Sequence, residues 1–431
     1  MEKRISPFEM AQALKQALEQ GLVTERDTSV VFYDLTLLKD RIERLLSLFP
    51  KSTLHAIAIK ANPLLRVLEY VRGLGNASRL GLEAASWPEL ELALRAGYGP
   101  REIVFDSPAK TSAEIEFALG LGVHLNIDNF QELARVDALI RQRAKRPKGS
   151  FGIRVNPQVG PGSIAATSVA NEYSKMGIPL DEHRKELIDA FAAFKWLNGV
   201  HVHIGSQGCG LDLLVRGVEA AYAFAREVNA SLGGERIQIL DIGGGLPVSY
   251  RDLDNAPGFA DYVKALKTSC PGLFGDEFRL VTEFGRTIHA GAGFTASRVE
   301  YVKPEKDIHT AIIHVGADMF LRKCYNPEDW HHDLSVADAG AGLKTGAHAT
   351  YNIAGPLCFA GDILAREIRL PEIKPNDWVL IHDTGAYTLS LWSRCNSRPI
   401  PLVLGFERKP GLTFQILKKR QSIQDIIAFW G

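Results

Sequence analysis

The chain has 431 residues, more than one hydrophobic core usually supports, so we expect two domains. Its 50 basic residues balance 50 acidic ones without any recurring block of like charge, which argues against nucleic acid or an anionic membrane surface as a partner. No apolar run is long enough for a signal peptide or a membrane span, and the five cysteines lack CxxC spacing. We therefore expect a cytoplasmic protein with reduced thiols and no membrane contact.

From Val30 to Val281, short apolar runs alternate with amphipathic segments, which is the pattern of repeated βα units and a parallel sheet. The candidate strands are SVVFYD, LHAIAIK, REIVFDS, HLNID, GSFGIRVN, LNGVHVHIG, QILDIGGG and FRLVTEF. About eight such units predict a closed (β/α)8 TIM-like barrel over residues 36–290. An open doubly wound sheet is the alternative, but no GxGxxG follows the first strand to support it.

After Gly293 the segments become short, rich in β-branched residues and punctuated by glycine and proline. Examples are ASRVEYVKPE, HTAIIHVG, ATYNIAGP, DWVLIHDTG and RPIPLVLG. This texture predicts an all-β domain over residues 291–431. We expect residues 1–35 to join it, because chain ends often meet.

Lys60 ends the apolar run AIAI and is followed by Ala-Asn-Pro. A lone lysine of this kind is ordinarily a solvated loop residue. In an α/β barrel, however, the C-terminal ends of the strands form the active-site face, so an amine delivered there is placed for chemistry.

Two further stretches sit at predicted strand ends. In LDIGGGLP, the glycines 243–245 either form a tight turn or aim several backbone N–H groups at a phosphate. In HVHIGSQ, alternation sends His201 and His203 to the same side of a strand, with Ser206 at its exit. Because no third ligand with matching spacing stands out, we expect no metal site here. An imidazole stacked on a planar ring fits better.

Glu283 and Arg286 end the last predicted barrel strand in VTEFGRT. A surface salt bridge is the ordinary interpretation of such a pair. A carboxylate at a strand end is also what a pyridine nitrogen needs if it must stay protonated. Cofactor chemistry of that kind combines a lysine Schiff base, an acid partner for the ring nitrogen and a phosphate cradle.

Taken together, these residues resemble a known family, the fold-type III decarboxylases that use pyridoxal 5'-phosphate. This group contains diaminopimelate and ornithine decarboxylases. The motifs KANP, HVHIGSQ, DIGGGLP, EFGR, GPLCFAGD and GAYTLS occur in the family's order and span nearly the whole chain. With CFAGD in place of the usual Cys-acid motif, the sequence resembles an atypical subgroup. The resemblance implies a head-to-tail homodimer whose active sites are shared between subunits.

The resemblance also implies a role for each matching residue. Lys60 would bind the cofactor as a Schiff base, His203 would stack on its ring, Glu283 would pair with the ring nitrogen, and Cys358 of a partner subunit would be the acid near the substrate. Residues expected around the phosphate are Ser206, Gly243, Gly244, Gly245, Gly285, Arg286 and Tyr387. Glu83 occupies the place where relatives commonly carry aspartate.

The substrate is where the sequence departs from the family. Many members carry an acid directly after the cysteine, facing the substrate's distal amine, and this chain has Phe359. Arg322 resembles the arginine that diaminopimelate decarboxylases use for the distal carboxylate, while the tyrosine expected after it is displaced to Tyr325. This pattern predicts a substrate with a distal anionic or polar group and no distal ammonium.

The sequence thus predicts a pyridoxal-phosphate-dependent amino-acid decarboxylase with altered substrate. In the related racemases an arginine takes the place of Glu283, so Glu283 favours decarboxylation. Two alternatives stay open: a racemase or decarboxylase of a carrier-tethered or modified amino acid, and a non-catalytic, decarboxylase-like regulator.

Overall fold

The computed structural model describes residues 3–75, 78–145, 148–251, 255–408 and 411–431. The described chain divides into two compact units. One is formed by residues 42–248 and 256–287, and the other by residues 3–41, 249–251, 255 and 288–431. No helix among the described residues is both long enough and apolar enough to cross a bilayer.

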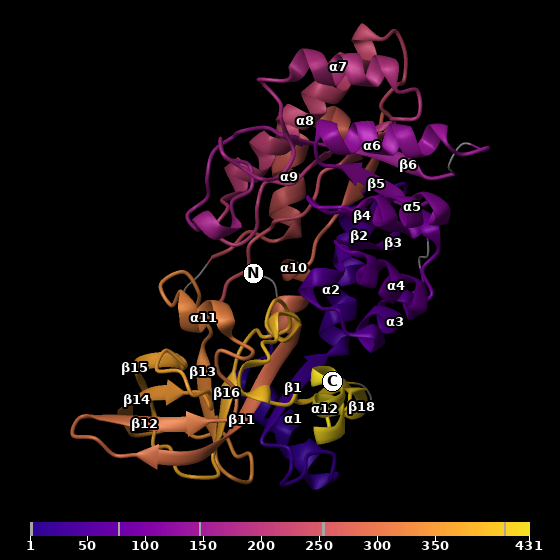
Figure 1. Ribbon diagram of the computed structural model, residues 1–431. Coiled ribbons are helices and arrows are strands. Elements are labelled where there is room, and N and C mark those ends of the chain that lie inside the picture. The colour runs from indigo at the N-terminus through magenta and orange to yellow at the C-terminus, as the bar shows by residue number, and fades with distance from the viewer. Residues whose placement is uncertain (1–2, 76–77, 146–147, 252–254, 409–410) are drawn as a thin grey trace. The chain divides into compact units, whose positions relative to one another are not determined.

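The first unit is a closed barrel of eight parallel strands, as the sequence predicts (Figure 1). Around the barrel the strands are β2 (Leu54–Ala58), β3 (Leu80–Ala84), β4 (Ile103–Asp106), β5 (His124–Ile127), β6 (Ser150–Asn156), β8 (Gly199–Val202), β9 (Ile239–Asp241) and β10 (Arg279–Thr282). Pairing of β10 with β2 closes the ring, and the two-residue β7 (Ile178–Pro179) adds to β6. The strands bury nearly every side chain, which is why they read as continuous apolar runs.

Helices follow the strands and surround the barrel. They are α2 (Leu35–Leu48), α3 (Leu65–Gly73), α4 (Trp87–Arg95), α5 (Ser112–Leu121), α6 (Phe130–Arg141), α7 (Arg184–Ala193), α8 (Leu211–Ser231), α9 (Phe259–Ser269) and the short α10 (Arg286–His289). Side-chain caps set several starts: Asn129, for instance, accepts the N–H of Glu132 at the start of α6. A buried apolar cluster joins the strands β2, β4, β9 and β10 and is formed by Leu54, Ala56, Val104, Ile239 and Val281.

One predicted barrel strand lies outside the barrel, and one strand of the barrel was not predicted. The segment SVVFYD is β1 (Ser29–Asp34), which belongs to the sheet of the second unit rather than to the barrel. The missing barrel strand is β3, whose sequence LGLEA carries Gly81 and a buried glutamate in place of an apolar run. Gly81 is needed there, because a Cβ would lie 2.1 Å from the backbone oxygen of Glu102.

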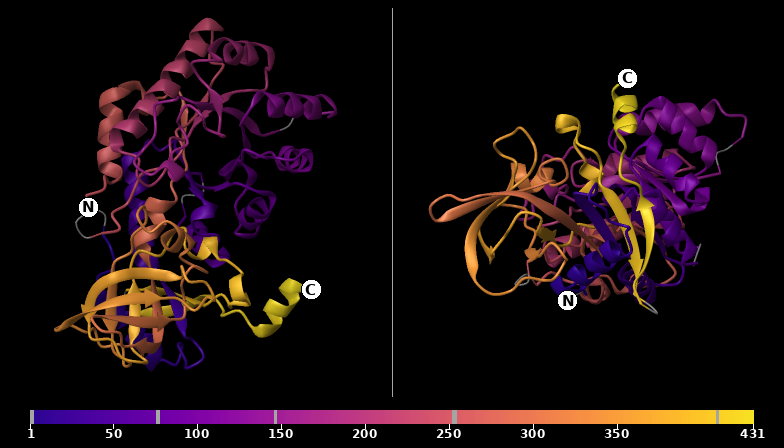
Figure 2. Two further views of the ribbon diagram at one scale, coloured as in Figure 1. Left: turned by 60° about the vertical axis from the view of Figure 1, so that its left-hand side comes forward. Right: turned by 90° about the horizontal axis from the view of Figure 1, so that it is seen from below.

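The second unit is built on a mixed sheet that includes the N-terminal strand β1. Along its main path the order is β15 (Ile363–Pro371), β14 (His348–Ala354), β12 (Ile308–Ile313), β11 (Gly293–Lys303), β1, β17 (Leu402–Glu407) and β18 (Thr413–Lys418). In addition, β16 (Trp378–Ile381) pairs with β11 and with β13 (Leu334–Ala337). Figure 2 shows the indigo β1 among the orange and yellow strands. The helices of this unit are α1 (Pro7–Glu19), α11 (Leu321–Tyr325) and α12 (Ile423–Trp430).

The position of β1 in the sheet follows from its buried sequence. All six residues of this strand are buried, and it lies antiparallel to β11 on one side and parallel to β17 on the other. The rings of Phe32 and Phe294 stack with centroids 4.7 Å apart across the β1–β11 pair. An N-terminal segment thereby becomes a central strand of the C-terminal sheet.

Candidate active site

Lys60 lies in η1 (Ile59–Ala61), the single 3-10 turn that leaves β2. Its Nζ is 2.6 Å from Oε2 of Glu83, which is fully buried on β3. Burial raises the pKa of Glu83 to about 8, although the ammonium of Lys60 pulls the other way. The lysine side chain is 37 % exposed. An accessible amine therefore lies beside a carboxyl group that can hold a proton near neutral pH.

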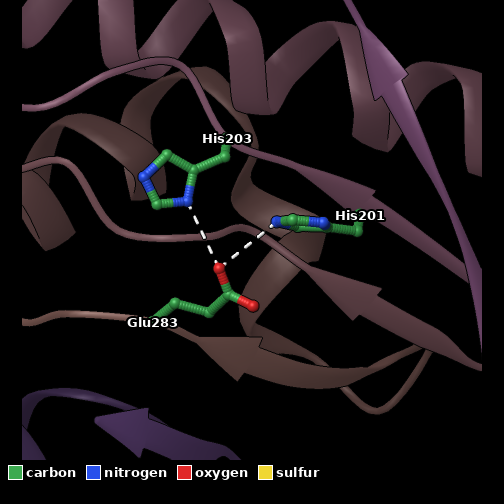
Figure 3. Close-up of side chains that lie close together, drawn as sticks. All are labelled: His201, His203 and Glu283. Carbon is green, nitrogen blue, oxygen red and sulfur yellow. Dashed lines mark hydrogen bonds and ion pairs between the residues drawn. The ribbon is translucent and has the colours of Figure 1, made fainter. Parts of the chain in front are cut away.

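Glu283 follows β10 and faces both predicted histidines (Figure 3). Its Oε2 is 3.2 Å from Nδ1 of His203 and 3.4 Å from Nε2 of His201. Both rings point to the same side of β8, as strand alternation predicts. The other oxygen of Glu283 is buried and has no hydrogen-bond partner within the described chain. One oxygen thus lies beside two imidazoles, and the other is buried near the carboxyl group of Asp241.

The electrostatics of this group depend on His201. Burial alone would lower the pKa of His201, but the carboxylates of Glu283, Asp106 and Asp241 outweigh it and raise that pKa well above 6.5. For Glu283, burial alone would raise the pKa, and the two histidines instead hold it well below 4.5. By contrast, burial lowers the pKa of His203. The geometry therefore favours a carboxylate at Glu283, an imidazolium at His201 and a neutral ring at His203.

Three further buried charged residues complete this cluster, and the sequence argument did not identify them. Asp106 ends β4, where its Oδ2 accepts a 2.7 Å hydrogen bond from Arg154 on β6, and its Oδ1 lies 3.6 Å from Nδ1 of His201. Asp241 ends β9, and burial together with the nearby Glu283 raises its pKa well above 3.8. The signal that could have found the two aspartates was a polar residue closing an apolar strand, as in IVFD and ILD.

The glycines 243–245 form the turn that leaves β9, and each needs to be glycine. Gly243 and Gly245 have φ of +64° and +99°. A Cβ on Gly244 would lie 2.4 Å from the backbone oxygen of Glu283, and one on Gly245 would lie 2.4 Å from that of Gly205. The backbone here packs too closely for side chains. Because the N–H of Gly243 already donates to Oδ1 of Asp241 at 3.0 Å, an anion at this turn would be met by the N–H groups that follow it.

Ser206 and Arg286 add charge and a hydroxyl to the same unit. Nε of Arg286, the first residue of α10, donates to Oγ of Ser206 at 3.1 Å. Arg286 is buried, and Gly285 directly precedes it at the end of the strand segment. A cation and a hydroxyl joined in this way form a typical anion site.

The remaining predicted residues lie in the second unit, where the structure groups them around α11. The guanidinium of Arg322 stacks over the rings of Trp330 and Tyr387 at 4.9 and 5.2 Å. The rings of Tyr325 and Phe359 stack at 5.1 Å, and Cys358 beside them is exposed. The predicted phosphate contact of Tyr387 stays a prediction, whereas its contact with Arg322 was not foreseen. Tyr387 has a φ of +53°, a backbone conformation that residues other than glycine rarely adopt.

Comparison with known proteins places this barrel in a family. Residues 35–290 match the family model described as "Pyridoxal-dependent decarboxylase, pyridoxal binding domain". This match covers more than half of the chain and includes every strand of the barrel. The similarity to diaminopimelate decarboxylases, described next, indicates a pyridoxal-phosphate-dependent amino-acid decarboxylase, which is a carboxy-lyase. The chain therefore belongs to the pyridoxal-dependent decarboxylase family.

Individual relatives extend the similarity over both units. A diaminopimelate decarboxylase from Pseudomonas aeruginosa is 32 % identical over 379 residues, covering 87 % of this chain and 86 % of the relative. One from Helicobacter pylori is 29 % identical over 384 residues, covering 87 % and 88 %. The crystal structure of diaminopimelate decarboxylase from Helicobacter pylori complexed with L-lysine superposes with a TM-score of 0.83 at 26 % identity, covering 96 % of this chain and 98 % of that one.

The residues present fit pyridoxal phosphate. The glycine turn and the Arg286–Ser206 pair suit a phosphate, and the unpaired buried oxygen of Glu283 suits a protonated ring nitrogen. Our reason for expecting no metal at the histidines was wrong, because Glu283 supplies a third donor from a strand far along the chain. The chemistry of pyridoxal phosphate would use these three groups together with the Lys60 amine and the Arg286–Ser206 pair, whereas a metal centre would use only the three.

The glycine turn gives a direct test of this fit. We expect Gly244→Ala to weaken binding of pyridoxal phosphate to the apoprotein by about tenfold or more, because the new Cβ displaces the backbone that meets Glu283. Fluorescence titration measures the affinity, with circular dichroism as the check on folding. Gly234→Ala is the matched control, because a Cβ at that position would meet no atom within 4 Å. A folded Gly244→Ala protein with wild-type affinity would contradict the assignment.

Proposed function

We propose that this chain decarboxylates an amino acid whose side chain ends in a carboxylate or another anionic or polar group, without a distal ammonium. The observation that carries this proposal is Phe359. It directly follows Cys358, stacks on Tyr325, and shares the neighbourhood of α11 with Arg322. A phenyl ring offers an ammonium no carboxylate to pair with. Phe359 is 38 % exposed in the single chain, so the cost of an unpaired charge, about 3 to 5 kcal/mol when fully buried, would apply once the substrate and the partner subunit cover the ring. Diamino acids such as meso-diaminopimelate and ornithine are therefore disfavoured.

The residues that the family resemblance singles out would hold pyridoxal phosphate. Lys60 would bind it covalently, Glu283 would face its ring nitrogen, and His203 would cover its ring. The phosphate would be held by Ser206, Gly243, Gly244, Gly245, Gly285, Arg286 and Tyr387. Support comes from the 3.1 Å contact between Arg286 and Ser206 and from the glycine turn. When bound, the cofactor supplies an electron sink for the charge that loss of CO2 leaves on Cα.

The chain's own contribution to that sink is a fixed negative charge. His201 and His203 hold Glu283 as a carboxylate in a buried site, where Coulomb attraction to a proton on a nearby nitrogen is strong. A neutral His203 adds no positive charge to the ring that it covers. Both features favour withdrawal of the electron pair from Cα into the pyridine ring.

Lys60 and Glu83 share a second task. A lysine that would bind and free the cofactor in each turnover has to lose and regain a proton on its amine. Glu83 lies 2.6 Å from that amine with a pKa raised by burial, so it can take up and return the proton. This gives a role to the residue that stands where relatives commonly carry aspartate.

The proposal includes a head-to-tail homodimer in the cytoplasm. Cys358 would reach the active site of the partner subunit and donate the proton to Cα. Its thiol is exposed in the single chain, which suits a group that acts on a neighbouring subunit. The other four cysteines are also free thiols, in keeping with a reducing compartment.

Lys60→Arg tests the reaction itself. Arginine keeps the positive charge beside Glu83 but cannot form the covalent bond, so we expect the borohydride-sensitive visible absorbance and CO2 release to fall below detection. A panel of amino acids, assayed for CO2 with the wild-type protein, identifies the substrate. Lys175→Ala, at an exposed loop lysine, is the control and should retain both signals. Full turnover by Lys60→Arg would refute the proposed function.

Phe359→Glu tests the substrate class. The new carboxylate would pair with a distal ammonium, so we expect decarboxylation of ornithine or meso-diaminopimelate to rise by about a hundredfold relative to wild type. Turnover of the wild-type substrate should fall, since a carboxylate repels a distal anion. Phe359→Leu is the control and should change neither preference. Wild-type protein that already prefers a diamino acid would overturn this part of the proposal.

A further inference from the structure

Asp362 is a buried carboxylate that joins two separate segments of the second unit. It is 2 % exposed and lies directly before β15. Its Oδ1 accepts the N–H of Ala317 at 2.5 Å, and its Oδ2 accepts the N–H of Leu357 at 2.7 Å. Each oxygen therefore holds the backbone of a different segment.

The segment that contains Leu357 also carries Cys358 and Phe359. Asp362 closes it through its own backbone as well, because its carbonyl accepts the N–H of Gly355 at 2.8 Å and its N–H donates to the carbonyl of Phe359 at 3.0 Å. Residues 355–362 thus form a turn that Asp362 fastens at Gly355, Leu357 and Phe359, while Oδ1 of Asn396 accepts the N–H of Cys358 at 2.8 Å. Cys358 and Phe359 lie in the middle of that turn.

The second segment leads into α11. The carbonyl of Gly316 accepts the N–H groups of Met319 and Phe320, and α11 starts at the next residue with Arg322 in its first turn. Asp362 holds this segment at Ala317. Where the two segments meet, Tyr325 stacks on Phe359 with an interplanar angle of 19°.

Two glycines show how closely the carboxylate is fitted. A Cβ on Gly316 would lie 2.0 Å from Oδ1 of Asp362, and a Cβ on Gly355 would lie 2.3 Å from its Oδ2. Each segment therefore presents a bare backbone to one carboxylate oxygen. A carboxylate has acceptors at both ends, whereas an amide of the same shape has one donor end that would face an N–H.

We infer that Asp362 is a positioning residue for substrate specificity: it fixes the turn that carries Cys358 and Phe359 against the segment that carries Arg322. Asp362 itself touches none of these three side chains by a hydrogen bond in the described chain, and acts through the backbone. The inference rests on the proposed function for the roles of those residues. The link between the two segments does not depend on it.

The test compares Asp362→Asn with a matched control. Asp338→Asn is that control, because Asp338 also accepts two backbone N–H groups, from Gly340 and Gly342, in an exposed turn of the same unit. We expect Asp362→Asn to raise the rate of Cys358 alkylation by iodoacetamide roughly threefold or more relative to the wild-type protein. We also expect the KM for the wild-type substrate to rise about tenfold, with a smaller change in kcat. Asp338→Asn should change none of these.

A measurement on wild-type protein covers the case in which Asp362→Asn does not fold. Hydrogen exchange with mass spectrometry should show slow exchange in peptides that contain the amides of Ala317 and Leu357. Fast exchange there, or an unchanged Cys358 rate and KM in folded Asp362→Asn, overturns the inference. A changed Cys358 rate in a protein that decarboxylates nothing refutes the proposed function and leaves the link between the segments standing.

Discussion

The site depends on a balance of charge that is buried at the C-terminal ends of the barrel strands. The carboxyl groups of Glu83, Asp106, Asp241 and Glu283 meet there with Arg154, His201 and Lys60. Unpaired charges in such a place would cost several kcal/mol each, so every member constrains the others. His201 is central, because its two ring nitrogens face Glu283 on one side and Asp106 on the other. The ionised state of Glu283 therefore depends on charged groups from several barrel strands.

The same strand ends also position the anion site. The carbonyl of Gly243 accepts the N–H of Glu283 at 2.8 Å, and the N–H of Gly243 donates to Asp241 at 3.0 Å. The carboxylate that we propose for the ring nitrogen and the turn that we propose for the phosphate are therefore held by one hydrogen-bonded network. Lys60 enters from the neighbouring β2 and is fixed by Glu83. The second unit repeats the principle on a smaller scale, since Asp362 ties two backbone segments with one buried carboxylate.

Much of this arrangement was predictable, because the signals were local. Apolar runs ending in Lys60, Glu283 or a glycine triplet marked the strand ends, and alternation put His201 and His203 on one face. The strand predictions failed where the local pattern was weak or where the pairing partners lay far away in the sequence. β3 was hidden by the glycine and the buried glutamate in LGLEA, and β1 reads like a barrel strand although its partners, β11 and β17, lie at the far end of the sequence. The pairing of Arg154 with Asp106, and of Asp362 with Ala317, joins segments that no spacing rule connects.

The central claim is that the strand-end amine of Lys60 is the group that holds pyridoxal phosphate. Its most direct test is to load the wild-type protein with pyridoxal phosphate, reduce it with borohydride, and locate the modified lysine by peptide mass spectrometry. We predict a single modified peptide, which contains Lys60. An excess of free phosphate and pyridoxine, added before the cofactor, should compete for Glu283 and the glycine turn and abolish this modification. Modification at Lys110, or at surface lysines without preference, would contradict the account.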